Sequence, residues 1–251
     1  MKILLVNDDG YSKEGIKVLD RALSSAGHEV WVAAPSSNRS AQSHSMSLSG
    51  VLEMTSFAPE HYHCSGSPAD CILYSLKGGL FPSLPDLVVS GINYGYNCSS
   101  DILYSGTCAA ACEAVLQGTR GIALSHEADE NGRYEFERVC AFFVRNLEKL
   151  YSLTGEDIYL NINFPPHFRE EVEYASVGRI FYHDIPEIID EKDGKKLLRL
   201  RPGAVKRDLT SQGIKTDIEI CMEGRISISV LKVNPQVDMD VRPAVTELCL
   251  S

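Results

Sequence analysis

Short apolar runs alternate with helical patterns over the first two thirds of the chain. Residues 2–6 form a continuous apolar run that ends in the polar turn 7–10, which is typical of a buried parallel strand. Apolar residues then recur at helical spacing over 16–26, and residues 30–34 form the next apolar run. This order predicts the β-α-β opening of a doubly wound α/β sheet.

Later patterns extend this sheet. Strands are predicted at 86–90, 121–125 and 157–162, and helices near 68–77, 107–117 and 134–151. Because strands alternate with helices through about residue 163, we expect a mostly parallel sheet with right-handed crossovers.

The pattern changes after Pro165-Pro166. Residues 172–177 and 226–233 are predicted strands, whereas 184–217 is polar, charge-rich and without helical periodicity. Asp193-Gly194 is a turn signal within that stretch. We therefore expect hairpins and extended arms, which pack on the core or reach a neighbouring subunit.

The length of 251 residues suits one large α/β domain, or one domain with an appendage. We treat 1–251 as a single unit with an α/β core over 1–165 and a C-terminal extension over 166–251. A net charge of −10 argues against binding a nucleic-acid backbone, which requires a basic face. A small phosphate substrate remains compatible, because a bound metal ion can invert the local charge.

No membrane partner is expected, because no apolar run approaches the roughly 18 residues of a membrane span. The apolar run at 2–6 is also too short for a signal peptide, and acids follow it. The eight cysteines are scattered and contain no CxxC pair. We interpret them as reduced thiols in a cytoplasmic protein.

Asn7-Asp8-Asp9-Gly10 is the first candidate for chemistry. Ligands bind at the carboxyl ends of the strands in an open α/β sheet, and the first strand delivers two carboxylates to that edge. Two adjacent negative charges there require a cation or protons, and oxygen ligands select Mg²⁺ or Mn²⁺. The alternative is an ordinary turn whose Asp residues cap the next helix.

The loop 35–45 follows the second strand and reaches the same edge of the sheet. It is rich in hydroxyls and amides, so it can supply a hydroxyl metal ligand and hydrogen bonds to phosphate. Arg39 and Ser43 are candidate phosphate-binding residues. The alternative is a flexible polar loop.

Ser90-Gly91-Ile92-Asn93-Tyr94-Gly95-Tyr96-Asn97 follows a third apolar strand. Its glycines let the backbone approach a ligand, and Asn93 and Asn97 offer neutral carbonyl oxygens. An ordinary Gly/Asn turn would show the same composition.

Tyr104-Ser105-Gly106-Thr107 opens a helix of small residues. The free N–H groups and the positive dipole end of such a helix make an anion site, although Ser105 or Thr107 can equally be plain caps. One metal-phosphate site would explain all four polar segments together. His61 and His63 alternate as on a strand face, but they lie far from the acids. The Walker, GxSxG and GxGxxG motifs are missing from the sequence.

These segments resemble the stationary-phase survival protein SurE family of 5′/3′-nucleotidases, in family order and spacing. The match is nearly continuous from residue 1 to about 125 and resumes weakly later. Its pieces are Asn7-Asp8-Asp9-Gly10, Ala34-Pro35, Asn38-Arg39-Ser40, Gly66-Ser67-Pro68-Ala69-Asp70-Cys71, Ser90-Gly91-Ile92-Asn93, Gly95, Asn97, Tyr104-Ser105-Gly106-Thr107, Leu160-Asn161-Ile162-Asn163-Phe164-Pro165 and Thr216-Asp217.

The resemblance implies a Rossmann-like three-layer core with a C-terminal extension exchanged between subunits of a homodimer, and dimers that can pair into tetramers. It implies one divalent metal ion held by Asp8, Asp9, Ser40 and Asn93. Phosphate contacts would come from Asn97, Ser105, Gly106 and Thr107. The implied activity is hydrolysis of nucleoside 5′- and 3′-monophosphates, with polyphosphate shortening in some members.

The chain departs from the family pattern after residue 180, where Lys195 to Pro202 replaces an aromatic-rich stretch and Ser229-Val230-Leu231 replaces Thr-Pro-Leu. Base preference, 3′ activity and oligomer size are therefore open, whereas the metal site is intact.

The mechanistic hypothesis places Asp8 and Asp9 at the catalytic centre, as metal ligands and as a general base. A competing mechanism makes Asp8 a nucleophile, as in haloacid-dehalogenase-like phosphatases, but their DxDx[TV] spacing is missing here. The alternative from another class is a non-catalytic nucleotide sensor on the same scaffold.

Overall fold

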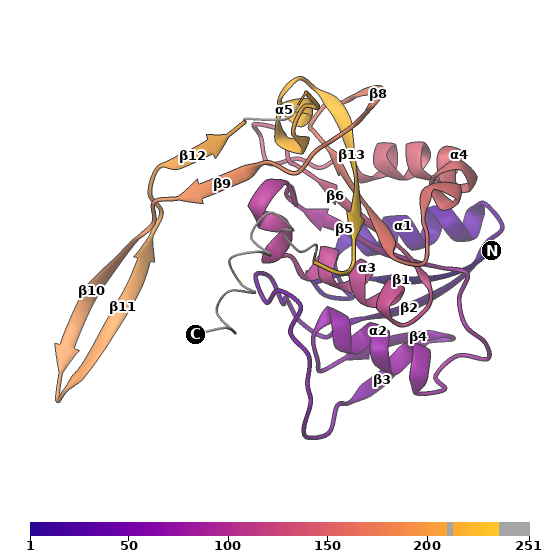
Figure 1. Cartoon of the computed structure of the whole chain (residues 1–251). Helices are drawn as coiled ribbons and strands as arrows, with labels where there is room; N and C mark the ends of the chain where they lie inside the picture. The colour runs from indigo at the N-terminus through magenta and orange to yellow at the C-terminus, as the bar shows by residue number, and fades with distance from the viewer. Residues whose placement is uncertain (210–212, 236–251) are drawn as a thin grey trace, which may run out of the picture.

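A computed structural model describes residues 1–209 and 213–235 of the chain (Figure 1). Its centre is a nine-stranded sheet with the order β3-β4-β2-β1-β5-β6-β7-β13-β8. The strands are β1 (Lys2–Val6), β2 (Glu29–Pro35), β3 (Met54–Ala58), β4 (His61–Cys64), β5 (Leu87–Tyr94), β6 (Arg120–His126), β7 (Ile158–Phe164), β8 (Arg169–Tyr174) and β13 (Arg225–Lys232). The run from β4 to β7 is parallel, as the sequence predicts.

Helices cover both faces of this sheet and complete three layers. The helices are α1 (Glu14–Ser25), α2 (Pro68–Lys77), α3 (Gly106–Leu116) and α4 (Phe136–Leu153), with the short η1 (Ser99–Leu103) before α3. Alternate residues of β1 serve the two faces: Ile3 and Leu5 pack with α1 and α4, whereas Leu4 and Val6 pack with α2 and α3. The predicted Rossmann-like three-layer α/β fold is confirmed.

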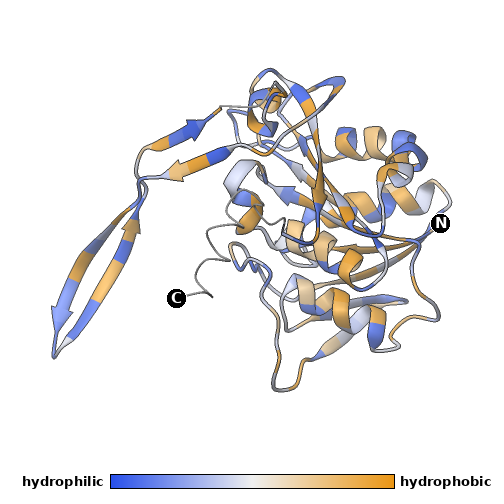
Figure 2. Ribbon diagram, viewed as in Figure 1, coloured by the Kyte–Doolittle hydropathy of each residue, from blue (hydrophilic) through white to orange (hydrophobic). Residues whose placement is uncertain are grey.

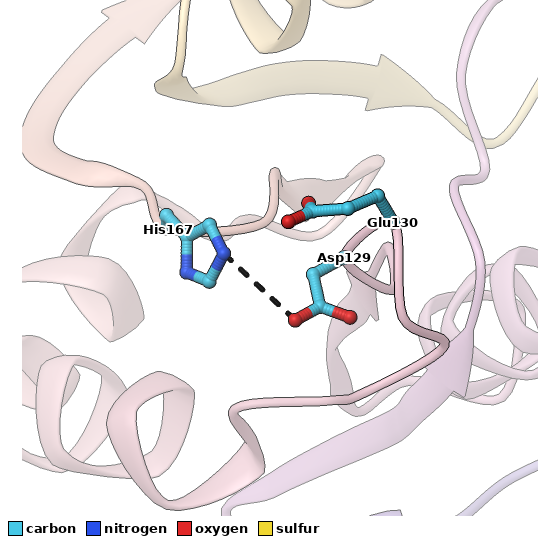
Figure 3. Close-up of side chains that lie close together, drawn as sticks. All are labelled: Asp129, Glu130 and His167. Carbon is cyan, nitrogen blue, oxygen red and sulfur yellow. Dashed lines mark ion pairs between the residues drawn. The ribbon is translucent and has the colours of Figure 1, made fainter.

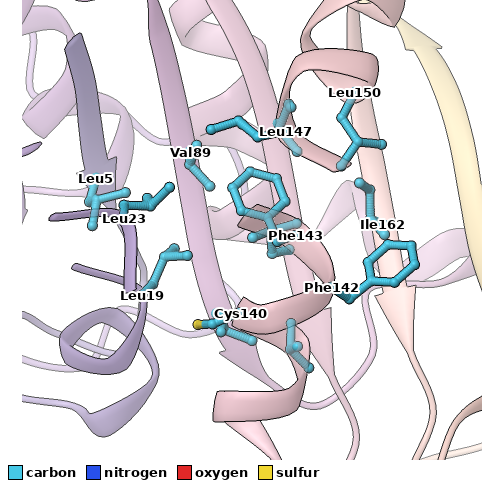
Figure 4. Packing of buried hydrophobic residues seen from close by; sticks show 14 of the residues in the cluster. Leu5, Leu19, Leu23, Val89, Cys140, Phe142, Phe143, Leu147, Leu150 and Ile162 are labelled. Carbon is cyan, nitrogen blue, oxygen red and sulfur yellow. The ribbon is translucent and has the colours of Figure 1, made fainter. Parts of the chain in front are cut away.

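The core under α1 and α4 is closely packed (Figure 4). Leu5 and Val89 rise from the sheet toward Leu19 and Phe143, and all four are fully buried. Burying an aliphatic or aromatic side chain contributes about 1.5–3 kcal/mol, so this layer fixes α1 and α4 to the strands. The loops that follow β1 and β5 therefore begin on a rigid base.

The sheet does not end at residue 165. β13 pairs antiparallel with β7, and β8 pairs with β13, so two strands of the C-terminal segment belong to the main sheet. β8 also begins and ends about three residues before the predicted strand 172–177. The short helix α5 (Asp217–Met222) follows the stretch in which no helical periodicity is visible.

Other differences from the predicted elements concern β3, β4 and β5. β3 and β4 were not among the predicted elements, because their mixed polar and apolar residues show no long apolar run. β5 continues four residues beyond the predicted strand 86–90, so Asn93 lies within the strand and not in a turn. Residue 94 still pairs with β6.

A two-part arm projects from the core (Figure 1). β9 (Arg179–Tyr182) pairs with β12 (Val205–Asp208), and β10 (Ile185–Lys192) pairs with β11 (Lys195–Arg201). The predicted hairpin with its turn at Asp193-Gly194 is confirmed. Apolar and polar segments follow one another along it (Figure 2), and its apolar side chains are exposed.

Two further sequence predictions concern the cysteines and membranes. Seven cysteines are free thiols, six of them buried, and Cys249 lies outside the described residues. No helix in the described part of the chain is long and apolar enough to cross a membrane. Residues 210–212 and 236–251 of the predicted extension also lie outside the described residues.

Candidate metal and phosphate site

Asp8 and Asp9 lie side by side at the carboxyl end of β1, and both are nearly buried. Asn7 makes the turn itself, because its side-chain amide donates to the Gly10 carbonyl at 2.9 Å and its oxygen accepts from the Gly10 amide at 3.1 Å. The residue before α1 is Lys13, whose side chain makes no capping bond. The two Asp side chains therefore neither close this turn nor cap α1.

Asp8 is held by the start of α3. The Thr107 hydroxyl donates to its carboxylate at 2.8 Å, and the backbone amides of Gly106 and Thr107 also donate to it. A Cβ atom at Gly106 would lie 2.8 Å from the Asp8 Cβ, so only glycine lets the helix approach this closely. Burial raises the pKa of Asp8, and these hydrogen bonds oppose that rise.

Asp9 is held by fewer hydrogen bonds than Asp8. Among the residues that the structure describes, its carboxylate accepts one hydrogen bond, from the Tyr94 amide at 3.3 Å. Burial and the neighbouring charge of Asp8 raise the pKa of Asp9 to about 6, and the more distant Lys13 ammonium opposes this only weakly. Within residues 1–209 and 213–235, neither acid has an ion-pair partner. The buried pair therefore carries negative charge that the side chains around it do not compensate.

The loop after β2 comes to the same edge. The Arg39 amide donates to the backbone carbonyl of Asp8 at 2.7 Å, which ties the residue before Ser40 to the end of β1. The Ser40 hydroxyl donates its proton to Asn38 at 2.5 Å, so its oxygen lone pairs remain acceptors. Ser43 lies further along, where its hydroxyl donates to the Leu103 carbonyl at 2.6 Å.

Arg39 turns its guanidinium toward the segment after β4. One terminal nitrogen donates to the Ser65 carbonyl at 2.6 Å. Its Nε is buried without a hydrogen-bond partner in the described part of the protein. A buried guanidinium N–H without a partner is costly, so an anion at this point would satisfy it.

Asn93 and Asn97 follow from β5. The Asn93 side-chain nitrogen donates to the Gly95 carbonyl at 3.0 Å, so its oxygen is the atom that remains for a cation. The Asn97 side-chain nitrogen donates to Ser125 at 2.8 Å. Both asparagines are thus oriented by their own neighbours.

Residues on other elements position this loop, and the sequence analysis gave them no role. Asn161 and Asn163 of β7 both donate to the Asn97 carbonyl, at 2.8 and 3.2 Å. Asp217 at the start of α5 accepts from the Ser99 amide at 2.7 Å and from its hydroxyl at 2.9 Å. The signal was present, because asparagines that alternate inside an apolar strand face a buried polar partner.

Ser105 is the N-cap of α3, and its side chain accepts from the Cys108 amide. The capping interpretation of this residue is therefore correct in the structure. The same helix start also directs its first amides at Asp8, so the positive end of the α3 dipole lies beside the acid pair.

Asp129, Glu130 and His167 form a separate surface cluster (Figure 3). His167 faces Asp129 at 3.9 Å and also contacts Glu135 at 3.4 Å. The Asp129 carboxylate already accepts from the backbone amides of Asn131 and Arg133, which close a turn. This cluster has a structural explanation as a turn whose Asp129 carboxylate pairs with the exposed His167, and it includes neither Asp8 nor Asp9.

The model of the Survival protein SurE family matches residues 3–184 of the chain. The chain belongs to the SurE family. The 5′-nucleotidase SurE of Beijerinckia indica is 34% identical over 100% of this chain and 96% of its own length. The 5′-nucleotidase SurE of a Cyanothece species is 38% identical over 93% of this chain and 91% of its own. The crystal structure of the SurE protein from Aquifex aeolicus matches with a TM-score of 0.80 at 30% identity, covering 99% of both chains.

The family prediction is confirmed, and it extends over the C-terminal segment in which the sequence resemblance is weak. The structural match covers nearly the whole chain, although the motifs concentrate before residue 125. The assignment of individual ligands to metal or phosphate stays a prediction.

Proposed function

We propose that this SurE protein is a metal-dependent 5′-nucleotidase that hydrolyses nucleoside 5′-monophosphates to nucleoside and phosphate. Nucleoside 3′-monophosphates and short-chain polyphosphate are proposed as further substrates. One observation carries the proposal: two buried, uncompensated carboxylates lie at the strand edge against the positive end of α3. The 5′-nucleotidases among the relatives support the same reaction class.

The donor set suits one divalent cation, Mg²⁺ or Mn²⁺. Asp8 and Asp9 would hold it with the Ser40 hydroxyl oxygen and the Asn93 amide oxygen, and all four donors are hard oxygens. The fit rests on the acid pair, whose charge the surrounding side chains leave uncompensated. When bound, such an ion polarises phosphate and lowers the pKa of water.

The side chains and backbone amides of the site orient the ligands and the phosphate and transfer a proton. Thr107 and the α3 amides fix Asp8 in one orientation, and the α3 dipole favours the negative charge of a phosphate nearby. One of the two carboxylates, Asp8 or Asp9, is the general base that we propose for the attacking water. Arg39, Ser43, Asn97 and Ser105 are the proposed phosphate and substrate contacts.

A panel of substrates tests this proposal. We expect phosphate release from nucleoside 5′-monophosphates with Mg²⁺ or Mn²⁺ and none with EDTA. Slower release from 3′-monophosphates and short polyphosphate would extend the substrate class. Nucleotide binding by folded protein without phosphate release under any metal would favour the nucleotide sensor instead. A trapped phosphoryl group on Asp8 would favour the nucleophilic mechanism.

We also propose a homodimer, with tetramers as the further assembly, and action in the cytoplasm. The exposed apolar residues of the arm support association between copies. The free buried thiols support a reducing location.

A further inference from the structure

A cavity of about 670 Å³ lies beside α3, and we call it the α3 cavity. One wall is a single face of the helix, formed by Ser105, Ala109 and Cys112. The other walls come from η1, the segment 177–179, Tyr159 and the end of β13, with Ser43 and His44 at one side. A volume of this size falls within the roughly 300–1,000 Å³ of small-molecule sites.

The α3 cavity adjoins the proposed phosphate site at the start of α3. Ser105 lines the cavity, and the next residue, Gly106, touches Asp8. Ser43 also lines it, and its bonds to the Leu103 and Tyr104 carbonyls fix the loop after β2 against η1. By contrast, a cavity of about 510 Å³ between α1 and α4 contains none of the predicted site residues.

The dimensions suit the organic part of a nucleotide. From Ser105 to Cys112 the helix rises about 10 Å, at about 1.5 Å per residue. A phosphate at the start of α3 would thus have the cavity extending away from it by about the length of a nucleoside. Ile102, Ala109 and Leu231 provide apolar surface for the faces of a planar base.

The far end of the α3 cavity is polar. His44 lies 2.8 Å from Glu113, which is 2% exposed and also accepts from Gln117 at 2.7 Å. Cys112 and Glu113 raise the pKa of His44 to about 9, so the ring is protonated at neutral pH. Its side chain is 32% exposed, which leaves it able to donate to an acceptor atom of a ligand.

We propose that the α3 cavity holds the ribose and base of the substrate whose phosphate binds at the start of α3, with His44 donating to an acceptor on the edge of the base. The proposal rests on the proposed nucleotidase function and assigns the specificity-determining part of the same site.

Cys112→Leu tests the assignment, because the larger side chain fills the middle of the α3 cavity. Leucine has a high helix propensity, so the substitution is compatible with α3. Leu116→Phe is the matched control, because it adds volume on the exposed side of the same helix. For adenosine 5′-monophosphate, Cys112→Leu raises KM about tenfold or more while kcat changes less than about twofold. For glycerol phosphate, which has no base or ribose, kcat/KM changes less than about twofold in either variant.

His44→Gln provides a second readout. It changes the ratio of kcat/KM between purine and pyrimidine nucleoside monophosphates and leaves glycerol phosphate hydrolysis at the wild-type rate. If His44 has a purely structural role, His44→Gln lowers kcat/KM for purine and pyrimidine nucleoside monophosphates by the same factor. That result would overturn its part in base recognition.

Adenosine separates failure of this inference from failure of the proposed function. By calorimetry, adenosine binds wild type and Leu116→Phe, and Cys112→Leu weakens binding about tenfold or more. Phosphate release from no ester by wild type would overturn the nucleotidase function, and adenosine binding would still decide the cavity. Folded Cys112→Leu with wild-type KM and wild-type adenosine affinity would overturn the cavity assignment.

Discussion

At the residue scale, the two acids of the site have different surroundings although they are neighbours in the chain. Asp8 accepts hydrogen bonds from the Thr107 hydroxyl and from helix amides, whereas Asp9 accepts one backbone hydrogen bond. Asp8 is therefore the more firmly oriented ligand, and Asp9 is the group more easily protonated.

The titration of Asp9 predicts a pH effect on stability in the absence of metal. Its folded-state pKa of about 6 lies above the ordinary 3.8, so folding favours the protonated form. The contribution of Asp9 to the free energy of unfolding is therefore most favourable at low pH. As the pH rises from about 4 to about 6, the free energy of unfolding falls by about 2 kcal/mol. Chemical unfolding in EDTA at several pH values measures this loss. Asp9→Asn should flatten the profile, and an equally steep profile in that variant would contradict the assignment.

Thr107→Val removes the hydroxyl that holds Asp8 and keeps the shape of the side chain. We expect the free energy of unfolding to fall by about 1–3 kcal/mol, because a buried hydrogen bond is lost. We also expect weaker Mn²⁺ binding by calorimetry, because Asp8 loses its fixed orientation. Thr107→Ser is the control, since it retains the hydroxyl. Equal metal affinity in Thr107→Val and wild type would show that the bond does not position the ligand.

At the element scale, α5 serves the site from a distance. Asp217 at its start accepts both the amide and the hydroxyl hydrogen bonds of Ser99, which begins η1. η1 in turn lines the α3 cavity. A helix of six residues thus holds one wall of the proposed substrate site.

Asp217→Ala should release η1. We expect a loss of about 1–3 kcal/mol in the free energy of unfolding, because two buried donors lose their acceptor. We also expect a higher KM for nucleoside monophosphates with little change in metal affinity. Asp190→Asn, an exposed position on β10, is the control. An unchanged KM with reduced stability would limit Asp217 to a structural role.

The elements that the sequence predicted are those with one dominant pattern. β1, β2, β6 and β7 are apolar runs buried on both faces, and α1 and α4 show one apolar stripe. β4 reads His-Tyr-His-Cys and pairs on both sides, so pairing and not apolar content makes it a strand. α5 is too short for periodicity, although its capping box at Thr216 and Glu219 was readable.

At the scale of the whole molecule, the parallel sheet explains why distant polar segments meet. The polar segments after β1, β2 and β5 share one edge, and Arg39, Tyr94 and Thr107 each bond to the acid pair there. The rule for strand ends predicts that meeting. It does not predict that Asn161, Asn163 and Asp217 hold the loops, because such pairing depends on the strand and helix contacts across the sheet.

The exposed apolar residues of the arm indicate that copies of this chain associate. β10 and β11 form an isolated hairpin whose Ile188, Ile189, Leu197 and Leu198 are each more than half exposed. An isolated hairpin is marginally stable alone, so burial against another subunit would stabilise it.

Replacing residues 185–201 with a short Gly-Ser turn tests this role of the arm. We expect wild type to sediment as a dimer or tetramer in analytical ultracentrifugation and the shortened chain to sediment as a smaller species. Mn²⁺ affinity is the control, because the acid pair lies in the core. The same oligomeric state for both proteins would place the interface elsewhere.

The most direct test of the central claim is phosphate release from adenosine 5′-monophosphate by wild type, Asp8→Asn and Glu130→Gln, each with Mn²⁺, Mg²⁺ or EDTA. Glu130 belongs to the surface cluster of three possible ligands and serves as the control. The acid pair account predicts metal-dependent release by wild type and Glu130→Gln, and a loss of about a thousandfold or more in folded Asp8→Asn. Metal-dependent release by Asp8→Asn at the wild-type rate would contradict it.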